Sequence, residues 1–577
     1  MINIIKKVGW FIKQEWKSYT FMLFMLLFMS LLLLTPAFVL GKAIDIIVSS
    51  SLTVALLVII VGLLILIPLL RYATSFIYNY TVAKTSQKLA FTFRKIYLKK
   101  LFQMDAEFYE KYQKGDLISR ATGDLDLITS AATSMLEGIV FNTGIIVFAI
   151  GIMAFTISWK LTLIAITIMP IGITVLNFIR MKKRQYVKKH RIIYAKMTEK
   201  ILESVEGQRV IRAYVQEDND LKDQYKAIDA DINSWSYMIK YENQLTPLFE
   251  LVYGITYILS FAFGAYFIMN QEMSLGQLIT FISYVGILYG PFISISGVFQ
   301  QINNATVAID RFDEIMKTEP TVKEEINDEK LITFKQIDFR NVSFKYPFDE
   351  TYTLKDINLT IHHGETLGVV GPTGSGKSTL IRQLLREFNV TDGEIYIDGK
   401  NISKFKIRDI RNLVGYVPQS HMLFRRGVYD NILIGNPEAS FEAVDKAMQV
   451  ADFKKDLPYL NQGLETKVGE GGATLSGGQK QRLSIARALV REPEILIMDD
   501  SLSAVDANTE ETIIHQLKQY RKNKTNIIIA HRFSAIRDAN LIIVMENGRI
   551  VDRGTHEELI SRDGWYKEQY IQQMSMK

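Results

Sequence analysis

Apolar residues dominate the first half of the chain and form six long stretches. Each stretch is close to the ~20 residues that a helix needs to cross a lipid bilayer. Stretches of this length and number do not suit the core of a soluble protein, so we expect a membrane domain. The expected spans are residues 19–40, 54–79, 136–157, 161–180, 246–269 and 276–298.

Two long segments separate the second span from the third and the fourth from the fifth. Their apolar residues recur at helical spacing, as in LAFTFRKIYLKKLF, so the spans are expected to continue beyond the membrane as helices. The chain would then reverse near residues 108–126 and 205–218, where short glycine-containing breaks are flanked by charged and aromatic residues. Such breaks suit docking against another domain; solvated loops are the alternative.

Lysine and arginine are concentrated in these two segments, whereas the short loops after the first, third and fifth spans contain few, chiefly Lys42 and Lys160. Because positive charge favours the cytoplasmic side, both long segments and both termini are predicted to be cytoplasmic. The N-terminus, MINIIKKVGWFIKQEWKSY, lacks the features of a signal peptide. We interpret it as an amphipathic stretch whose Trp10, Trp16 and lysines lie at the membrane surface; an ordinary soluble helix is the alternative.

From Phe334 onwards the pattern changes to short β-rich runs that alternate with helices. This alternation predicts an α/β domain with a largely parallel core. The expected fold class is therefore a multi-domain membrane protein, with an N-terminal all-α six-helix transmembrane domain and a C-terminal α/β domain. Residues 1–316 are assigned to the first domain, the charged stretch 317–333 to a linker and residues 334–577 to the second domain.

The composition agrees with a membrane component. Hydrophobic residues make up 48% of the 577 residues, and a chain of this length exceeds one compact core. The net charge of +6 is modest and fits basic cytoplasmic loops as well as it fits nucleic-acid binding. The sequence contains no cysteine, which excludes disulfides and cysteine-ligated metal sites.

The strongest local motif of the second domain is GVVGPTGSGKSTL. An apolar strand at 367–370 leads into a glycine-rich loop and then into a helix, which is the context that a phosphate-binding loop requires. Its glycines let backbone N–H groups close around phosphate oxygens, and the helix N-terminus adds a positive dipole end. Lys377 is expected to reach the outer phosphates, and Ser378 to ligate Mg²⁺. The remaining expected nucleotide contacts of this loop are Gly371, Gly374, Ser375, Gly376 and Thr379.

A second motif, LSGGQKQRLSIARAL at residues 475–489, narrows the class. It resembles the signature motif of ATP-binding-cassette (ABC) proteins, and the resemblance implies that its first residues contact ATP held by a partner chain: Ser476, Gly477, Gly478 and Gln479. Other cassette elements follow in the family's order, and each has an ordinary structural explanation when taken alone. By this resemblance, Tyr346 stacks on adenine, Gln419 senses Mg²⁺ and the membrane domain, Glu470 lies in the segment that contacts the coupling loops, Asp499 holds Mg²⁺ through water, Asp506 belongs to the loop that crosses the dimer interface, and His531 is the γ-phosphate switch.

The resemblance covers nearly the whole chain, because six spans fused in front of one cassette resemble the half-transporters of the multidrug and lipid exporter group. In that family two cassettes pair head to tail. Each ATP lies between the phosphate loop of one cassette and the signature of the other. The resemblance therefore implies ATP and Mg²⁺ as cofactors and a second half-transporter as a partner in the plasma membrane.

Asp500 departs from the family pattern, because hydrolysing relatives usually have glutamate as the general base after the magnesium acid. Aspartate is shorter by one CH₂, so its carboxylate is badly placed for the attacking water. We expect the site on this chain's phosphate loop to bind MgATP and to hydrolyse it poorly. This pattern resembles the degenerate-site half of bacterial heterodimeric multidrug exporters, although such halves often lack the histidine that His531 supplies here. A homodimer with a slow aspartate base is the alternative.

Substrate clues are few. Glu250 in the fifth span and Glu137 near the start of the third could attract a cationic drug, because acids inside a membrane are costly unless they are used; pairing within a neighbouring helix is the plainer explanation. The expected cargo is a hydrophobic or cationic small molecule or a lipid. A homodimeric lipid or peptide flippase and an ATP-binding sensor without transport are the rivals. Nucleic-acid partners are disfavoured by the six spans and by the single cassette.

Overall fold

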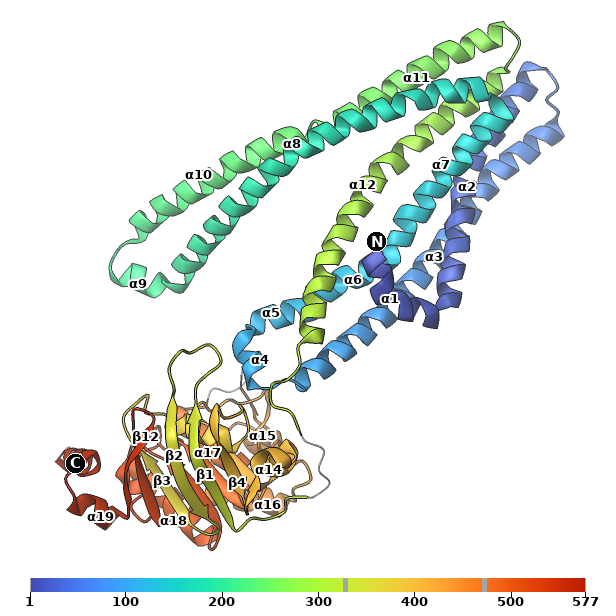
Figure 1. Cartoon of the computed structure of the whole chain (residues 1–577). Coiled ribbons are helices and arrows are strands. Elements are labelled where there is room, and N and C mark those ends of the chain that lie inside the picture. The colour runs from blue at the N-terminus through green and yellow to red at the C-terminus, as the bar shows by residue number, and fades with distance from the viewer. Residues whose placement is uncertain (1, 325–329, 470–474, 576–577) are drawn as a thin grey trace. The chain divides into compact units, whose positions relative to one another are not determined.

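The computed structural model describes residues 2–324, 330–469 and 475–575, which fold into two units (Figure 1). The first unit comprises Met1–Leu101 and Gly115–Thr318, and the second comprises Phe102–Lys114 and Glu319–Lys577. A short segment of the first intracellular stretch thus belongs to the second unit, together with the C-terminal part of the chain. The expected fold class is confirmed, since the N-terminal part is helical and the C-terminal part contains the sheets.

The N-terminal part of the chain is built entirely of helices within the described residues. Two proline-containing helices, α2 and α3, follow a short first helix, and two very long helices, α8 and α12, complete the unit. The elements are α1 Ile2–Gln14, α2 Trp16–Val48, α3 Val54–Phe102, α4 Ala106–Lys111, α5 Lys114–Ser119, η1 Arg120–Asp124, α6 Leu125–Leu136, η2 Glu137–Phe141, α7 Asn142–Ile152, η3 Met153–Ile157, α8 Trp159–Glu206, α9 Gln208–Ala213, α10 Glu217–Glu242, α11 Leu245–Met269 and α12 Leu275–Lys317.

Five helical segments of the described chain are long and apolar enough to cross a membrane, and each contains one expected span. Between 6% and 41% of the residues in their apolar windows are buried within the chain, so much of this surface is left for lipid or for another subunit. The fourth expected span, residues 161–180, lies inside the continuous helix α8. Within α8, the apolar helical stretch is the shorter Trp159–Ile168.

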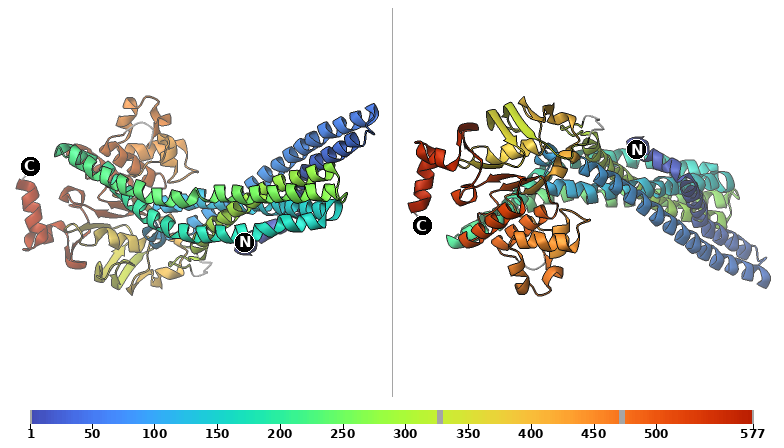
Figure 2. Two further views of the ribbon diagram at one scale, coloured as in Figure 1. Left: turned by 90° about the horizontal axis from the view of Figure 1, so that it is seen from above. Right: turned by 90° about the horizontal axis from the view of Figure 1, so that it is seen from below.

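Helices α8 and α10 form an antiparallel arm joined by α9 (Figures 1 and 2). Gly207 ends α8, and the chain turns back within residues 205–218, where the sequence placed a reversal. The arm is stabilised along its length by polar pairs between its own two helices, such as Ser204 with Asp220 and His190 with Ser234, each at 2.9 Å. Large apolar side chains remain exposed at its tip, among them Val205, Val210, Tyr214, Val215 and Tyr225.

Helices α2 and α12 approach each other unusually closely at one end. A Cβ added to Gly276 would lie 2.0 Å from the carbonyl oxygen of Gly41, so this contact requires glycine. Asp45 of α2 accepts hydrogen bonds of 2.8 Å from the hydroxyl of Ser274 and from the backbone N–H of Gly276, which lie at the start of α12. Small residues thus let two spans pack backbone to backbone, as is common in membrane helices.

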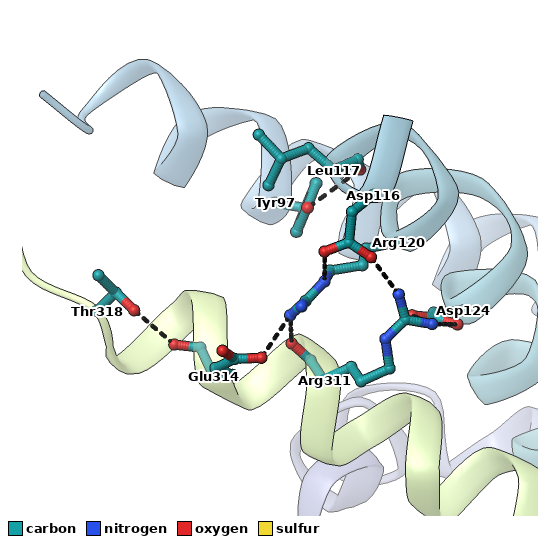
Figure 3. A network of polar contacts seen from close by, with 8 residues as sticks. All are labelled: Tyr97, Asp116, Leu117, Arg120, Asp124, Arg311, Glu314 and Thr318. Atoms are coloured by element: carbon teal, nitrogen blue, oxygen red, sulfur yellow. Dashed lines mark hydrogen bonds and ion pairs between the residues drawn. The ribbon is translucent and has the colours of Figure 1, made fainter. Parts of the chain in front are cut away.

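A cluster of charged residues ties the end of α12 to α5 and η1 (Figure 3). The guanidinium of Arg120 is nearly buried and donates to Asp116 at 2.8 Å, to Glu314 at 2.8 Å and to the carbonyl of Arg311 at 2.6 Å. Arg311 in turn pairs with Asp116 and with Asp124. Because η1 is a π-helical turn, a local distortion that often marks functional positions, it directs both Arg120 and Asp124 at α12.

The second unit contains an antiparallel sheet of four strands, a mainly parallel sheet of six strands and a small two-stranded sheet. The four-stranded order is β2-β1-β4-β5, the six-stranded order is β12-β11-β3-β10-β9-β6, and β7 pairs with β8. The strands are β1 Gln336–Phe344, β2 Leu354–His362, β3 Thr366–Val370, β4 Asp392–Ile397, β5 Lys400–Asn401, β6 Val414–Val417, β7 Arg426–Gly427, β8 Lys467–Val468, β9 Ile495–Asp499, β10 Thr525–Ile529, β11 Leu541–Glu546 and β12 Arg549–Gly554.

Helices cover the six-stranded sheet and enclose two apolar cores. Strand β9 is buried at every position, as its sequence ILIMD suggests. The helices are α13 Lys377–Leu384, α14 Ile407–Leu413, α15 Val428–Leu433, α16 Phe441–Val450, α17 Gly477–Leu489, α18 Ala507–Tyr520, α19 His556–Ser561 and α20 Trp565–Ser575.

Replacing Arg120 by leucine is expected to destabilise the first unit. The change leaves Asp116, Asp124 and Glu314 facing Arg311 alone, and removing one partner of a buried ion pair typically costs about 3–5 kcal/mol. The midpoint of thermal unfolding of the purified full chain in detergent should fall by about 5 °C or more. Arg94→Leu is the control, because the Arg94–Asp126 pair is exposed and should contribute about 1 kcal/mol or less. Equal shifts in the two variants would contradict a central role for the cluster.

Candidate nucleotide-binding site

Parallel strands bring the predicted nucleotide residues to one edge of the six-stranded sheet. Strands β3, β10, β9 and β6 run in the same direction, and Ile529 pairs with both Val369 and Asp499. Their carboxyl ends therefore finish almost level with one another. The loops that follow these ends carry the phosphate loop, Asp500, His531 and Gln419 to the same edge, where α/β folds usually bind ligands.

The phosphate loop adopts a conformation that requires its glycines. Gly371, Gly374 and Gly376 have φ values of 147°, 81° and 98°, in the region that L-residues rarely occupy. A Cβ on Gly371 would also lie 2.0 Å from the carbonyl oxygen of Met545. Helix α13 begins immediately afterwards at Lys377, so the strand–loop–helix order expected from the sequence is present.

Lys377 and Ser375 place polar groups inside this loop. The ammonium of Lys377 is largely buried and donates hydrogen bonds of 2.8 Å to the carbonyls of Gly371 and Pro372. Burial lowers the pKa of Lys377, and the charges of Asp499 and Asp500 oppose this shift. The hydroxyl of Ser375 is buried and has no hydrogen-bond partner within the described residues. A cation and an unpaired donor enclosed by a glycine loop fit the oxygens of a phosphate group.

Ser378 and Asp499 meet across the sheet edge. The hydroxyl of Ser378 donates to the carboxylate of Asp499 at 2.9 Å, and Asp499 is buried at the end of β9. Burial raises the pKa of Asp499, and the hydrogen bond from Ser378 opposes this rise. A hydroxyl beside a carboxylate is the oxygen-rich pair that Mg²⁺ prefers, so these two residues would hold the ion.

Asp500 is held in a left-handed backbone conformation with φ 46°. Aspartate is among the few residues that tolerate this region. Its backbone is anchored on both sides, because its N–H donates to the carbonyl of Ile529 and its carbonyl accepts from Ser503, each at 3.0 Å. Asp500 and His531 line one cavity of about 70 Å³, so the structure brings these two predicted residues together.

Three other predicted nucleotide residues are Tyr346, which lies beside the phosphate loop, and Gln419 and His531, which are exposed. The phenol of Tyr346 is 3.1 Å from the hydroxyl of Thr379 in the first turn of α13, which places the aromatic ring beside the phosphate loop. Gln419 lies in the loop after β6, with an exposed side chain, and His531 is exposed as well. Side chains of this kind at the rim of the site remain accessible to a nucleotide.

The signature residues begin helix α17 on the surface. Ser476 and Gln479 form a reciprocal capping box, in which each side chain bonds to the other residue's backbone N–H. Ser476 and Gly477 are exposed. The start of the helix is fixed from behind by Asp456, which accepts two hydrogen bonds of 2.8 Å from the buried guanidinium of Arg482. The signature therefore presents a rigid helix N-terminus to whatever covers this face.

The remaining predicted residues lie elsewhere. Asp506 caps α18 by accepting from the backbone N–H of Thr509 at 3.0 Å, and this hydrogen bond lowers its pKa. Glu470 lies outside the described residues. In the first unit, Glu250 on α11 and Glu137 on η2 are both exposed on the single chain.

Sequence reasoning did not single out three residues of this region. Asp456 orients the signature helix, Arg382 bonds to the phenol of Tyr346, and His421 lies two residues beyond Gln419. Burial lowers the pKa of His421, and the charge of Asp500 opposes this shift. The proximity of His421 to Gln419 in sequence was the available signal, whereas Asp456 and Arg382 are brought to the site by the tertiary fold.

Replacing Lys377 by methionine is expected to remove most of the affinity for MgATP. The substitution keeps the apolar stem but deletes the buried cation, and truncating such a group typically costs enough for about a 100-fold loss. Binding of a fluorescent ATP analogue to the purified chain measures this. Lys345→Met is the control, since Lys345 adjoins Tyr346 but is exposed, and its effect should stay below about threefold. Retained affinity in the Lys377 variant would refute the assignment of the loop.

Comparison with known proteins agrees with this geometry. Residues 19–292 match the ABC transporter transmembrane region, and residues 354–503 match the ABC transporter domain. The probable multidrug resistance ABC transporter ATP-binding/permease protein YheI of Bacillus subtilis (strain 168) is 37% identical over 574 residues, which cover 99% of this chain and 98% of that protein. The multidrug resistance-like ATP-binding protein MdlA of Escherichia coli (strain K12) is 30% identical and covers 99% of this chain and 96% of its own length.

Two further relatives extend the comparison. The ATP-dependent lipid A-core flippase of Pseudomonas fluorescens (strain Pf0-1) is 33% identical over 509 residues, which cover 87% of this chain and 84% of that protein. The solved structure of a bacterial Atm1-family ABC exporter with ATP bound superimposes with a TM-score of 0.82 at 24% identity, covering 96% of this chain and 99% of that one, and shows the shared fold. The chain therefore belongs to the ABC transporter family and is a multi-pass membrane exporter with one transmembrane domain and one cytoplasmic ATPase domain, which couples ATP hydrolysis to transport.

Proposed function

We propose that this chain is one half of a heterodimeric ATP-driven exporter, that its own phosphate loop binds MgATP but hydrolyses it poorly, and that its signature completes a competent site with the partner chain. The observation that carries the proposal is Asp500 at the position of the general base. The proposed cargo is a hydrophobic or cationic drug or a lipid.

The groups at the sheet edge support MgATP as the ligand. Lys377 and the unpaired hydroxyl of Ser375 lie inside the phosphate loop, and Ser378 faces Asp499 at 2.9 Å. In this proposal the ion is held by Ser378, Gln419 and, through water, Asp499, and it neutralises charge on the outer phosphates. Tyr346, which lies beside the first turn of α13, stacks on adenine.

The hydrogen-bonded backbone of Asp500 prevents the main chain from shifting to make up for the shorter side chain. Its N–H and its carbonyl are both hydrogen-bonded, to Ile529 and to the side chain of Ser503. The main chain therefore has little freedom to move the carboxylate forward by the length of the missing CH₂. A general base must lie within hydrogen-bond reach of the water it activates. Nucleotide affinity depends on other residues and is expected to persist.

The exposed signature supports a role in a second site. Ser476 and Gly477 lie on the surface at the N-terminus of α17, and the Asp456–Arg482 pair holds that helix in place. A rigid helix N-terminus supplies backbone N–H donors to an anion. Across a cassette dimer, the anion is the ATP bound by the partner's phosphate loop, where a glutamate base would hydrolyse it.

Exporters of this type work as dimers, and the single chain exposes apolar side chains that suit contact with a second subunit. The tip of the α8–α10 arm exposes Val210, Tyr214 and Val215, each at 60% or more. Exposed apolar side chains that gather on one element indicate a protein interface. A partner of different sequence is part of the proposal, because a homodimer would carry Asp500 at both sites.

The names of the relatives support two cargo classes. The similar proteins of Bacillus subtilis and Escherichia coli are described as multidrug resistance proteins, and that of Pseudomonas fluorescens as a lipid A-core flippase. Amphipathic drugs and lipids share an apolar body. The exposed Glu250 of α11 favours the drug class in this proposal, because a carboxylate at membrane depth attracts a cation.

The purified chain alone is expected to bind MgATP and to turn it over slowly. Asp500→Glu should raise its turnover by about 10²-fold, the usual contribution of a well-placed base. Steady-state release of phosphate per bound nucleotide measures this. Asp552→Glu, which lengthens an acid of β12, is the control and should change nothing. Brisk hydrolysis by the unmodified chain as a self-paired assembly would refute the weak-site proposal.

In the presence of the partner, Glu250→Gln is expected to slow efflux of a cationic dye while efflux of a neutral dye of similar size persists. Loss of the carboxylate removes an attraction for the cation that is worth about 1 kcal/mol or more away from water, or roughly a fivefold change. Reconstituted vesicles loaded with each dye measure the two rates. Glu272→Gln is the control, since Glu272 pairs with Lys160 outside the spans. Unchanged cation transport would refute the proposed attraction of the cation by Glu250.

A further inference from the structure

A cavity of about 230 Å³ lies between helix α18 and the six-stranded sheet, near the amino ends of the strands and away from the predicted phosphate loop. Alternate residues of two paired strands line it: Leu496 and Met498 of β9, and Asn526 and Ile528 of β10. Side chains alternate along a strand, so these four project from one side of the sheet. Helix α18 completes the wall with residues three or four positions apart, which share one helical face: Ile514, Leu517, Lys518 and Arg521.

The inner wall of this cavity is apolar. Leu496 and Met498 are buried, and Leu517 and Ala539 are nearly so. Protein interiors are usually packed without spaces of this size. An apolar cavity of about 150 Å³ is large enough for benzene. The larger volume found here therefore suits a flat apolar body of about two fused rings.

Cationic side chains gather around the same cavity. Four of its lining residues are basic: Lys518, Arg521, Lys522 and Lys524. Asp538 is the one acid among the described residues that line it, and it is already paired with Lys518 at 3.0 Å. Lys522 is exposed and has no ion-pair partner within the described chain. The excess of positive charge favours an anion at this position.

Arg521 is held rigidly in the wall. Its guanidinium donates hydrogen bonds to the carbonyls of Pro493 and Thr525, at 2.8 and 2.9 Å, and to the side chain of Asn526 at 2.7 Å. Burial lowers the pKa of Arg521 to about 10, and the charge of Glu494 opposes this shift. Arg521 therefore remains a cation at neutral pH, in a position fixed by the backbone around it.

Three residues of the inner wall also line the smaller cavity beside Asp500 and His531. Met498, Ile528 and Ala535 belong to both linings, so one layer of side chains separates the two cavities. Methionine is flexible and changes rotamer easily. A ligand that fits the larger cavity would restrict Met498 and hold this shared wall in the arrangement seen here, in which the space beside Asp500 and His531 is open.

We propose that the cavity beside α18 binds a small amphipathic anion, such as an aromatic carboxylate or sulfonate, and that the bound anion raises the affinity of this chain for nucleotide. The apolar body of the ligand lies against Met498 and Leu517, and its charged group lies among the lysines and Arg521. The binding of the anion is independent of the proposed function, whereas its effect on nucleotide rests on the proposed nucleotide site.

Binding is tested on the full chain in lipid nanodiscs, with ¹³C-labelled methionine methyl groups and 2-naphthalenesulfonate as the probe. The resonance of Met498 is identified by its loss in Met498→Leu. We expect it to shift saturably with a Kd of about 1 mM or lower, as suits a ligand of this size. The resonance of Met545, which lies in the other apolar core of this unit, should not shift. Absence of a saturable shift at Met498 would overturn the proposal.

The charge of the ligand is tested with two further probes. The neutral analogue 2-naphthalenemethanol lacks the anionic group and should bind at least about fivefold more weakly. Inorganic sulfate lacks the apolar body and should leave the Met498 resonance in place. Equal binding of the neutral and anionic probes would show an apolar cavity without selectivity for anions, and would contradict the proposed ligand class.

Variants locate the bound probe. The double variant Lys518→Gln with Lys522→Gln changes only exposed side chains and should weaken binding of 2-naphthalenesulfonate about fivefold. Lys335→Gln with Lys404→Gln removes two exposed charges elsewhere in the unit and is the matched control, with a change below about twofold. Ala539→Leu fills part of the cavity and should weaken binding about tenfold or more. Unchanged binding in the double variant of Lys518 and Lys522 would place the probe elsewhere.

The effect on nucleotide is measured as the affinity for AMP-PNP with Mg²⁺, with and without saturating 2-naphthalenesulfonate. We expect the probe to raise this affinity about fivefold, and nucleotide to raise the affinity for the probe by the same factor. An unchanged or lowered affinity for AMP-PNP would refute the coupling, and a lowered one would indicate competition at the phosphate loop. If AMP-PNP does not bind even without the probe, the proposed nucleotide site is wrong, and the shift at Met498 still decides whether the anion binds.

Discussion

Parallel pairing of β3, β10, β9 and β6 is the constraint on which the nucleotide site depends. Ile529 is paired with both Val369 and Asp499, so the three central strands end within a residue of each other. The phosphate loop, Asp500 and His531 follow these strands and come from distant parts of the sequence. The register of the strands brings them together. A slip of one residue in β9 would turn the Asp499 carboxylate to the opposite face of the sheet and away from Ser378.

The same register accounts for the behaviour proposed for Asp500. Its N–H continues the pairing of β9 with β10 by donating to Ile529, and immediately afterwards the chain turns through a left-handed conformation. Aspartate is one of the residues that tolerate this conformation. The backbone that positions the acid thus also fixes how far its carboxylate can reach. In the proposal, binding and hydrolysis are separable because the phosphate loop lies between β3 and α13, whereas Asp500 follows the end of β9.

Patterns along the sequence were sufficient for the parts of the fold that local physics determines. Long apolar stretches predicted helices, and five of the helical segments described are long and apolar enough to cross a membrane. The order of strand, glycine loop and helix around Lys377 predicted the local structure that is present. Residues that act through tertiary pairing left no such pattern. Arg120 contacts Glu314 across 194 positions, and Asp456 reaches Arg482 across 26. The left-handed backbone of Asp500 depends on hydrogen bonds to Ile529 and Ser503 and could not be read from its side chain.

Helix α4 shows why the domain boundary could not be read from the order of elements alone. Chain continuity places it among the membrane helices, yet Asp105 and Glu110 bond to residues of the second unit. Each of these bonds is charge-assisted, and such bonds are about twice as strong as neutral ones. Six residues of helix are too short to be stable alone, so α4 is ordered by what it contacts.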